Sequence, residues 1–275
     1  MEKKWKFIKS KNNKKLSIEL ENNIVIGNQK NINVMAGPCS VESWSQIDEV
    51  GSFLSGLGIK IIRGGCFKPR TSPYSFKGLE LKGLQFLNDV KEKYNLKVIT
   101  EVKDSTQVQD VLEVADIVQV GAKAMWDYGI LNQLGRTSNP VMIKRSFAAT
   151  TQECCQIAEY LLNDGNKNVI VCERGIRTFE PNSRFTLDLC GAAWIKNKTI
   201  LPIFLDPSHA MGFSYGVPEL SLACVATNPD GIIIEVHPDP SVAKSDASQQ
   251  LNFKEFEILF KKMKNVANAI GSNLV

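Results

Sequence analysis

The chain has 275 residues, of which 33 are Lys or Arg and 29 are Asp or Glu, so its formal net charge is +4. Its 43% hydrophobic and 23% charged residues are typical of soluble globular proteins and exclude disordered, collagen-like and low-complexity scaffolds. No apolar run approaches the ~18 residues of a membrane-spanning helix, so we expect no membrane partner. The length fits two average domains or one (β/α) barrel of about 250 residues.

The N-terminal stretch predicts a short hairpin. The apolar runs 24–26 and 32–35 flank a polar turn at 27–30, and we expect them to pair and to close the lower end of a barrel. The residues before them are rich in lysine, including Lys3, Lys9 and Lys15. We interpret these lysines as a solvated tail, with a nucleic-acid-binding arm as the alternative, and expect no nucleic-acid partner.

Eight short runs rich in β-branched residues follow, separated by helical patterns. Most are continuously apolar, as expected for parallel strands covered on both faces. Between the first two, Ile47, Val50 and Leu54 have helical spacing after Ser43, a candidate N-cap. The pattern predicts an α/β fold, a single (β/α)8 TIM barrel, with an open doubly wound sheet as second choice. The runs are 33–37, 59–63, 97–101, 116–121, 141–145, 169–173, 202–206 and 231–236.

We therefore divide the chain into a lysine-rich extension with its hairpin, residues 1–31, and a catalytic barrel, residues 32–275. The seven cysteines are an odd number in scattered apolar contexts. Because no N-terminal apolar signal segment precedes them, we expect a reducing, cytoplasmic location and no disulfide framework. The adjacent pair Cys154 and Cys155, and also Trp126, are assigned to packing.

Cationic residues follow the ends of the predicted strands. In a (β/α) barrel these ends and the loops after them form the active face. Such cations would make a positive wall that suits phosphates and carboxylates, since Arg can bind planar oxyanions through two parallel bonds. The alternative is that they are solvated or paired with Glu101 and Glu173. The six cations are Arg63, Lys68, Arg70, Lys123, Lys144 and Arg174.

A second group brings a thiol, an imidazole and two carboxylates from the first, seventh and eighth strands, which are neighbours once a barrel closes. This set suits Mn²⁺, Fe²⁺, Co²⁺ or Zn²⁺ better than Mg²⁺ or Ca²⁺. His237 lies two residues after Glu235, so a strand would point both inward, and spacing leaves open which of the two binds a metal. The set is Cys39, His209, Glu235 and Asp246.

At these residues the sequence resembles the 3-deoxy-7-phosphoheptulonate (DAHP) synthase family, in its short bacterial form without a regulatory domain. The resemblance covers about residues 33–260. It implies a TIM barrel that condenses phosphoenolpyruvate with erythrose 4-phosphate, the first step of the shikimate pathway, using a divalent metal, in a dimer or tetramer. The motifs are AGPCSVES (36–43), GGCFKPRTSPYSFKG (64–78), VGAKAM (120–125), IKR (143–145), CERGIRTFE (172–180), DPSHA (206–210), IEVHPDP (234–240) and SDASQQL (245–251).

The resemblance also implies roles for single residues, with the metal held by the four ligands above and His237 beside them or in a loop. The expected substrate-binding residues are Arg63, Lys68, Pro69, Arg70, Thr71, Gly121, Ala122, Lys123, Lys144 and Arg174. The aldose phosphate would contact the loop 68–71. The expected catalytic residues are Lys68, Lys144, Cys39 and His209. We expect Lys144 to donate a proton, and a Schiff base is the rival role for it.

The sequence departs from the family pattern at Lys123 and Ala124, where Arg and Asn are usual; Lys keeps the charge and loses the two-pronged contact. The stretch 145–148 also lacks an expected glycine. One alternative function is that of the sister enzyme, 3-deoxy-octulosonate 8-phosphate synthase, which uses arabinose 5-phosphate; Lys-Pro-Arg-Thr-Ser at 68–72 favours the four-carbon sugar. Another is a non-catalytic barrel that binds phosphometabolites. With no extra domain in the sequence, we expect no built-in feedback inhibition.

Overall fold

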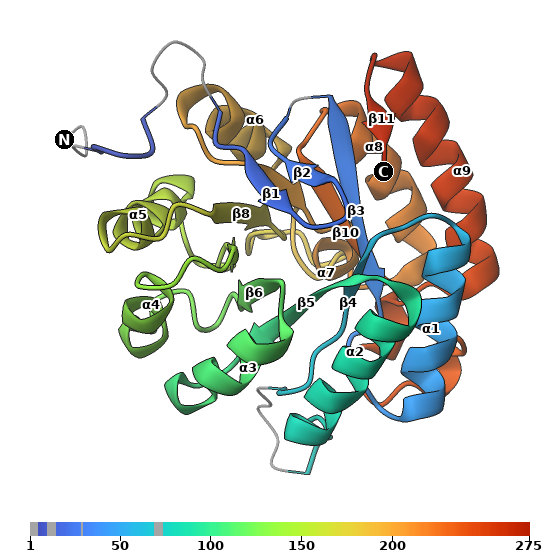
Figure 1. Ribbon diagram of the computed structural model, residues 1–275. Helices are drawn as coiled ribbons and strands as arrows, with labels where there is room; N and C mark the ends of the chain where they lie inside the picture. Colours follow the sequence, from blue (N-terminus) through green and yellow to red (C-terminus); the bar gives the residue numbers. More distant parts are fainter. Residues whose placement is uncertain (1–4, 10–14, 29, 69–73) are drawn as a thin grey trace.

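The computed structural model describes residues 5–9, 15–28, 30–68 and 74–275. Its centre is a closed barrel of parallel strands, β3 to β10 in chain order, with helices around it (Figure 1). The ring closes where β10 (Gly231–Glu235) pairs in parallel with β3 (Asn31–Gly37), which places Glu235 opposite Gly37. This closure confirms the predicted TIM barrel and excludes the open doubly wound sheet.

Each predicted run overlaps one barrel strand, with ends that differ by at most two residues. The other barrel strands are β4 (Ile61–Arg63), β5 (Lys97–Val102), β6 (Ile117–Val120), β7 (Val141–Lys144), β8 (Val169–Glu173) and β9 (Ile203–Leu205). The helices are α1 (Trp44–Gly56), α2 (Glu80–Tyr94), α3 (Val108–Val114), α4 (Tyr128–Leu134), α5 (Thr151–Asn163), α6 (Leu189–Lys198), α7 (Pro207–Met211), α8 (Val217–Ala226) and α9 (Phe253–Ala269). Short 3₁₀ turns are η1 (Ser105–Gln107), η2 (Ser214–Gly216), η3 (Pro240–Val242) and η4 (Ala247–Gln249).

Local signals in the sequence fix where helices begin. The Ser43 side chain accepts a hydrogen bond from the Gln46 backbone N–H, so Ser43 caps α1 as predicted. At α5, Thr150 and Glu153 form a reciprocal capping box. These caps start each helix directly after a strand end and its loop, which keeps those loops on one face of the barrel.

The hairpin exists, but one of its strands was predicted wrongly. β2 (Ile24–Ile26) pairs antiparallel with β1 (Ile18–Leu20), whereas residues 32–35 lie inside β3 of the barrel. The reason is the turn between β1 and β2: Asn22 and Asn23 have φ values of 61° and 57°. Two successive positive φ angles are what a tight hairpin turn needs, and Asn tolerates them better than most residues. The polar stretch predicted as the turn instead links the hairpin to β3.

The hairpin lies across one end of the barrel (Figure 1). Its residues Ile18, Ile24 and Ile26 are buried against side chains inside the barrel, among them Phe204 and Met35. A second, larger core fills the space between the sheet and the helices. The two-residue strand β11 (Asn273–Leu274), which was not predicted, pairs with the first residues of β3, at the same end of the barrel as the hairpin.

The described part of the lysine-rich segment is anchored, in contrast to the solvated tail that we expected. The Glu159 carboxylate on α5 accepts backbone hydrogen bonds from residues 6–8, and Ile8 is fully buried. Farther along, Lys15 Nζ donates to Thr199 O at 2.7 Å. Residue Lys3 lies outside the described residues. Apolar burial and a buried carboxylate therefore hold this segment against α5 and α6.

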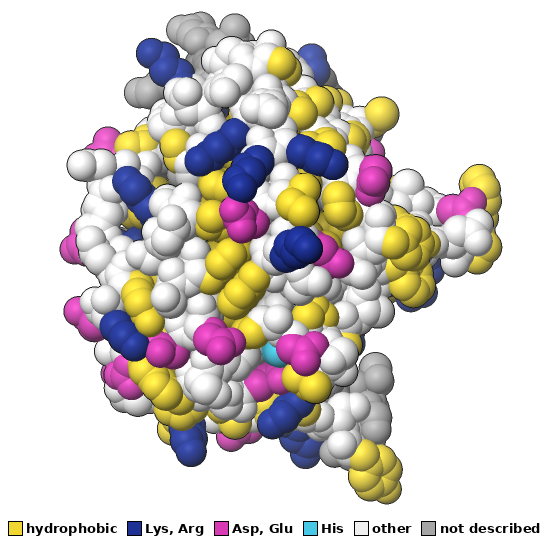
Figure 2. Space-filling model, turned by 90° about the vertical axis from the view of Figure 1, so that its right-hand side faces the viewer, with side chains coloured by type: hydrophobic (Ala, Val, Ile, Leu, Met, Phe, Trp, Pro, Cys, Tyr) yellow, Lys and Arg dark blue, Asp and Glu magenta, His cyan; other side chains and the backbone are white. Residues whose placement is uncertain are grey.

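The surface over α1 and α9 mixes Lys and Arg with Asp and Glu side chains (Figure 2). Nothing on this face resembles the one-sided positive charge of a nucleic-acid-binding surface. Within the described ranges, no helix combines the length and the hydrophobicity needed to cross a bilayer.

Candidate active site

The described candidate residues gather at the carboxyl ends of the barrel strands. Arg63, Lys144 and Glu235 are the last residues of β4, β7 and β10. Cys39 follows β3, and His209 lies in α7, which begins two residues after β9. Since all strands of the barrel are parallel, these positions share one rim, as the sequence predicted.

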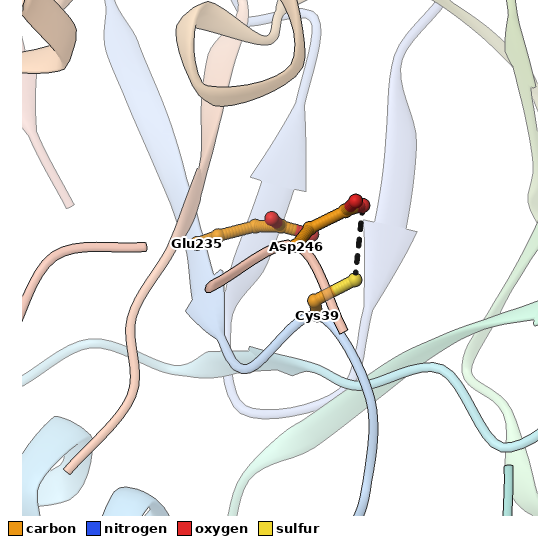
Figure 3. A group of neighbouring side chains, drawn as sticks. All are labelled: Cys39, Glu235 and Asp246. Atoms are coloured by element: carbon orange, nitrogen blue, oxygen red, sulfur yellow. Dashed lines mark hydrogen bonds between the residues drawn. The ribbon is translucent and has the colours of Figure 1, made fainter. Parts of the chain in front are cut away.

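Three potential ligands meet at this rim (Figure 3). Among the described residues, Cys39, Glu235 and Asp246 each offer a ligand atom within 4.8 Å of the other two. Cys39 Sγ lies 3.4 Å from Asp246 Oδ2. His209 stands beside them, with Nε2 at 3.5 Å from Glu235 Oε1. A thiol, an imidazole and two carboxylates in this arrangement fit a divalent transition metal.

The protonation of this group follows from burial and nearby charge. Burial raises the pKa of the Cys39 thiol to about 12 and lowers the pKa of His209. Burial alone would raise the pKa of Glu235, but the neighbouring His209 and Arg63 outweigh it and lower the pKa. For Asp246, His209 and Arg184 likewise outweigh burial, and the pKa falls to about 2. Both carboxylates are therefore ionised at neutral pH, which is the form that binds a metal.

Two cations of the predicted wall are tied to this group. Arg63 Nη1 donates to Glu235 Oε1 at 2.6 Å and to Pro38 O at 2.7 Å. Lys68 Nζ donates to Cys39 Sγ at 3.1 Å. The cationic wall and the potential metal ligands are thus one connected site.

A third cation is connected through Asp206. Its carboxylate accepts from Lys144 Nζ and lies 2.8 Å from His209 Nδ1. Burial would raise the pKa of Asp206, but His209 and Lys144 outweigh it and hold the pKa well below its usual range. Asp206 is therefore an anion shared by an ammonium and an imidazole, and it orients both.

Arg174 is the strongest sign of an anionic ligand. Its guanidinium lies 4.2 Å from the centre of the Phe185 ring, and its buried Nη1 has no hydrogen-bond partner in the described structure. Burial lowers the pKa of Arg174. A buried cationic donor without a partner costs free energy unless a ligand supplies one. Arg174 is held in place through Glu173, which accepts from Arg145 Nη1 at 2.8 Å and from the Gly175 backbone at 2.7 Å.

The remaining predicted residues lie as follows. Gly121 is packed so closely against Glu101 that a Cβ on it would come within 2.1 Å of Glu101 Oε1. Lys123 is exposed at the rim beside Ala122. The alternative was that the cations of the wall pair with Glu101 and Glu173. Among the described residues, Glu101 accepts a hydrogen bond from Gln119, and Glu173 pairs with Arg145, which is not one of the six wall cations. Pro69, Arg70 and Thr71 lie outside the described residues.

His237, which the spacing left open as a ligand, faces away from the other ligands. Its Nδ1 accepts from the Asp239 backbone at 3.1 Å, and its Nε2 lies 3.7 Å from Glu42 Oε2. The sequence analysis also did not single out Gln249 and Gln250, whose amides form hydrogen bonds with Glu235 and with the Cys39 backbone. Their motif was recognised, but amides give no signal of their own in a sequence.

The profile of the DAHP synthetase I family matches residues 13–271 of this chain. The chain belongs to this family. It is 44% identical over 238 residues to a phospho-2-dehydro-3-deoxyheptonate aldolase from Thermotoga maritima. The aligned region covers 86% of this chain and 70% of that relative. More distant is a 2-dehydro-3-deoxyphosphooctonate aldolase from Fusobacterium nucleatum, 33% identical over 87% of this chain and 91% of that relative.

Solved structures of the family agree with the fold. The crystal structure of the Thermotoga maritima phospho-2-dehydro-3-deoxyheptonate aldolase (DAHP synthase) matches with a TM-score of 0.93 and 43% identity, over 96% of this chain and 77% of that chain. A truncated form of the 3-deoxy-D-arabino-heptulosonate 7-phosphate synthase from the same organism matches with a TM-score of 0.89 and 39% identity, over 96% of each chain.

Proposed function

We propose that this member of the DAHP synthetase I family condenses phosphoenolpyruvate with erythrose 4-phosphate to 3-deoxy-D-arabino-heptulosonate 7-phosphate and phosphate. The observation that carries the proposal is the hydrogen-bonded ion pair between Arg63, a cation of the wall, and Glu235, one of the potential metal ligands. This contact supports a site for an anionic enol phosphate next to a site that can polarise an aldehyde. The deoxyheptonate relative from Thermotoga maritima is 44% identical to this chain, and the phosphooctonate relative from Fusobacterium nucleatum is 33% identical.

Cys39, His209, Glu235 and Asp246 would hold a divalent transition metal such as Mn²⁺, Fe²⁺, Co²⁺ or Zn²⁺. When bound, the metal supplies a Lewis acid for the aldehyde oxygen of the sugar phosphate. The fit rests on the three ligand atoms within 4.8 Å and on the ionised state of both carboxylates.

The cationic residues hold the phosphoenolpyruvate. Arg174, with its unpartnered Nη1, binds an oxyanion of the substrate, and Arg63 and Lys144 fix its other charged end. We expect Lys68 and the loop 69–71 to hold the aldose phosphate. Fixing both substrates so that their reacting carbons lie within about 3.5 Å provides much of the rate enhancement.

The chemistry then needs few further groups. The enol carbon forms a bond to the aldehyde carbon, water adds to the neighbouring carbon, and the carbon–oxygen bond to phosphate breaks as the added oxygen becomes the ketone. We expect Lys144 to give a proton to the new alkoxide, because Asp206 holds its ammonium in the buried site. The added water loses two protons, of which one restores Lys144 and the other leaves with the phosphate. A Schiff base to Lys144 is not needed, since an enol phosphate is already activated.

The two alternatives are tested by one assay. Phosphate release is measured with phosphoenolpyruvate and either erythrose 4-phosphate or arabinose 5-phosphate, with and without a chelator. The proposal requires release with the four-carbon sugar that the chelator abolishes. Release with arabinose 5-phosphate alone would assign the octulosonate reaction, and no release with either aldose would assign a binding function.

Two further expectations belong to the proposal. We propose that the protein acts in the cytoplasm, because its cysteines are free thiols, as is usual in a reducing compartment. We also propose a dimer or a tetramer, which sedimentation of the purified chain would test.

A further inference from the structure

Two adjacent buried side chains, Gln249 and Gln250, touch the loops that carry the potential metal ligands. Each is 1% exposed. We propose that this amide pair positions Cys39, Glu235 and Asp246 for metal binding. The inference rests on the proposed function, since it assumes that these residues bind a metal.

Gln250 links the loop of Cys39 to the loop of Asp246. Its Oε1 accepts from the Cys39 backbone N–H at 2.9 Å, and its Nε2 donates to Ser245 O at 2.9 Å. Asp246, the next residue, has a φ of 46°, in the left-handed region that Asp adopts at a cost. By anchoring the carbonyl before Asp246, Gln250 holds this conformation, in which the carboxylate faces Cys39 Sγ.

Gln249 links the two carboxylates. Its Nε2 donates to Glu235 Oε2 at 2.6 Å, which leaves Glu235 Oε1 turned toward His209 and Arg63. Its Oε1 accepts from Arg184 Nη1 at 2.9 Å, and the same Arg184 nitrogen lies 3.5 Å from Asp246 Oδ1. Gln249 therefore selects which oxygen of Glu235 faces the other ligands.

The backbone around Leu251 brings the two amides to the end of β10. Leu251 donates to Glu235 O and accepts from the His237 backbone N–H, both at 3.0 Å, so the chain at Leu251 runs beside the end of β10. Gln249 is the last residue of the 3₁₀ turn η4 and Gln250 is extended, so the backbone conformation changes between the two amides. Each position also needs a donor and an acceptor at the end of a long side chain, and the glutamine amide supplies both without charge.

The test compares Gln249→Met and Gln250→Met, which keep the side-chain length and remove the amide, with Asn166→Leu as the matched control. Asn166 is also a buried amide, and it donates to Leu134 O and Asn139 O away from the site. Co²⁺ is titrated into each metal-free protein against a competing chelator, and the thiolate-to-cobalt absorption band is recorded. Melting temperatures are measured in parallel.

We expect both Met variants to bind Co²⁺ at least tenfold more weakly than the unchanged chain and to shift the absorption band. Asn166→Leu should lower the melting temperature and leave affinity and band unchanged. Wild-type affinity and spectrum in both Met variants would overturn the positioning role. If a Met variant does not fold, the variant Gln249→Asn or Gln250→Asn at the same position gives the same comparison, because asparagine holds the amide one methylene farther back. No tight Co²⁺ binding by the unchanged chain would instead refute the metal site of the proposed function.

Discussion

Arg63 and Glu235, which are 172 residues apart in the sequence, form a buried ion pair with Nη1 at 2.6 Å from Oε1. One residue belongs to the cationic wall and the other to the potential metal ligands. A change in either residue is therefore transmitted to both halves of the site.

Arg63→Lys tests this connection. Both bonds of Arg63 come from Nη1, and lysine has one nitrogen in place of the three of the planar guanidinium. It keeps the charge but cannot hold Glu235 and Pro38 O and also present further N–H groups to the substrate, so both the carboxylate and the bound substrate lose their orientation. We expect kcat/KM for phosphoenolpyruvate to fall about 100-fold, the order seen for loss of one preorganised donor. Arg136→Lys, at an exposed site, is the control. Equal kcat/KM for both variants would contradict the coupling.

Cys39→Ser should abolish metal-dependent turnover. A serine hydroxyl is a poor substitute for a thiolate toward transition metals. Cys190→Ser provides the matched control, because Cys190 is exposed while Cys39 is buried. Activity is measured by phosphate release after chelation and re-addition of Mn²⁺. Undiminished activity of Cys39→Ser would remove Cys39 from the ligand set.

Metal affinity should increase with pH. In the metal-free protein burial raises the pKa of Cys39 to about 12, so the thiol is protonated at neutral pH and must release its proton to the solvent when it binds an ion. Burial lowers the pKa of His209, and Asp246 has a pKa of about 2, so neither releases a proton in this range. We expect about one proton released per ion, and hence about tenfold tighter binding per pH unit between pH 6.5 and 8. Calorimetry in two buffers of different ionisation enthalpy measures the released protons, and a pH-independent affinity would count against the thiolate ligand.

Asp206→Asn should impair catalysis more than binding. The amide keeps the side-chain volume but removes the charge that holds Lys144 and faces His209, and it leaves a buried ammonium without its anion. Breaking a buried pair in this way costs about 3–5 kcal/mol of stability. We expect a lower melting temperature and a kcat reduced by about 100-fold with a smaller change in KM. A normal kcat would show that Asp206 does not hold Lys144 for proton transfer.

Gly231→Ala tests the packing inside the barrel. A Cβ at Gly231 would lie 2.0 Å from the Phe204 ring, so the ring or one of the two strands must shift. We expect a loss of about 1–3 kcal/mol in the free energy of unfolding, as for other overpacked cores. Adding Phe204→Leu should recover part of it, and thermal denaturation of the single and double variants measures this. An unchanged free energy of unfolding in the single variant would mean that the side chains inside the barrel rearrange without loss of stability.

Periodicity and strand ends predicted the barrel and its active rim because buried parallel strands leave continuous apolar runs. The hairpin pairing was missed because the deciding feature is the backbone conformation of Asn22 and Asn23, and the polar turn that follows carries an equally strong signal. The anchoring of residues 6–8 was missed because it depends on Glu159, more than 150 residues away. Long-range contacts of this kind leave no local pattern.

In the site, residue types predicted which positions carry the functional side chains, because thiols, imidazoles and guanidinium groups are recognisable in a sequence as metal ligands or anion-binding groups. The orientation of His237 toward Glu42 could not be predicted, because its position two residues after Glu235 would place both on one face of a strand. The strand ends at Glu235, so the alternation does not extend to His237. The roles of Gln249 and Gln250 depend on geometry alone.

The apolar hairpin seals the end of the barrel opposite the rim. Both reactants must therefore enter, and both products leave, through a single opening. Phosphate therefore leaves by the route through which the sugar enters, and the two cannot pass through the opening independently. Any molecule that rests across that opening would arrest turnover without displacing one reactive side chain.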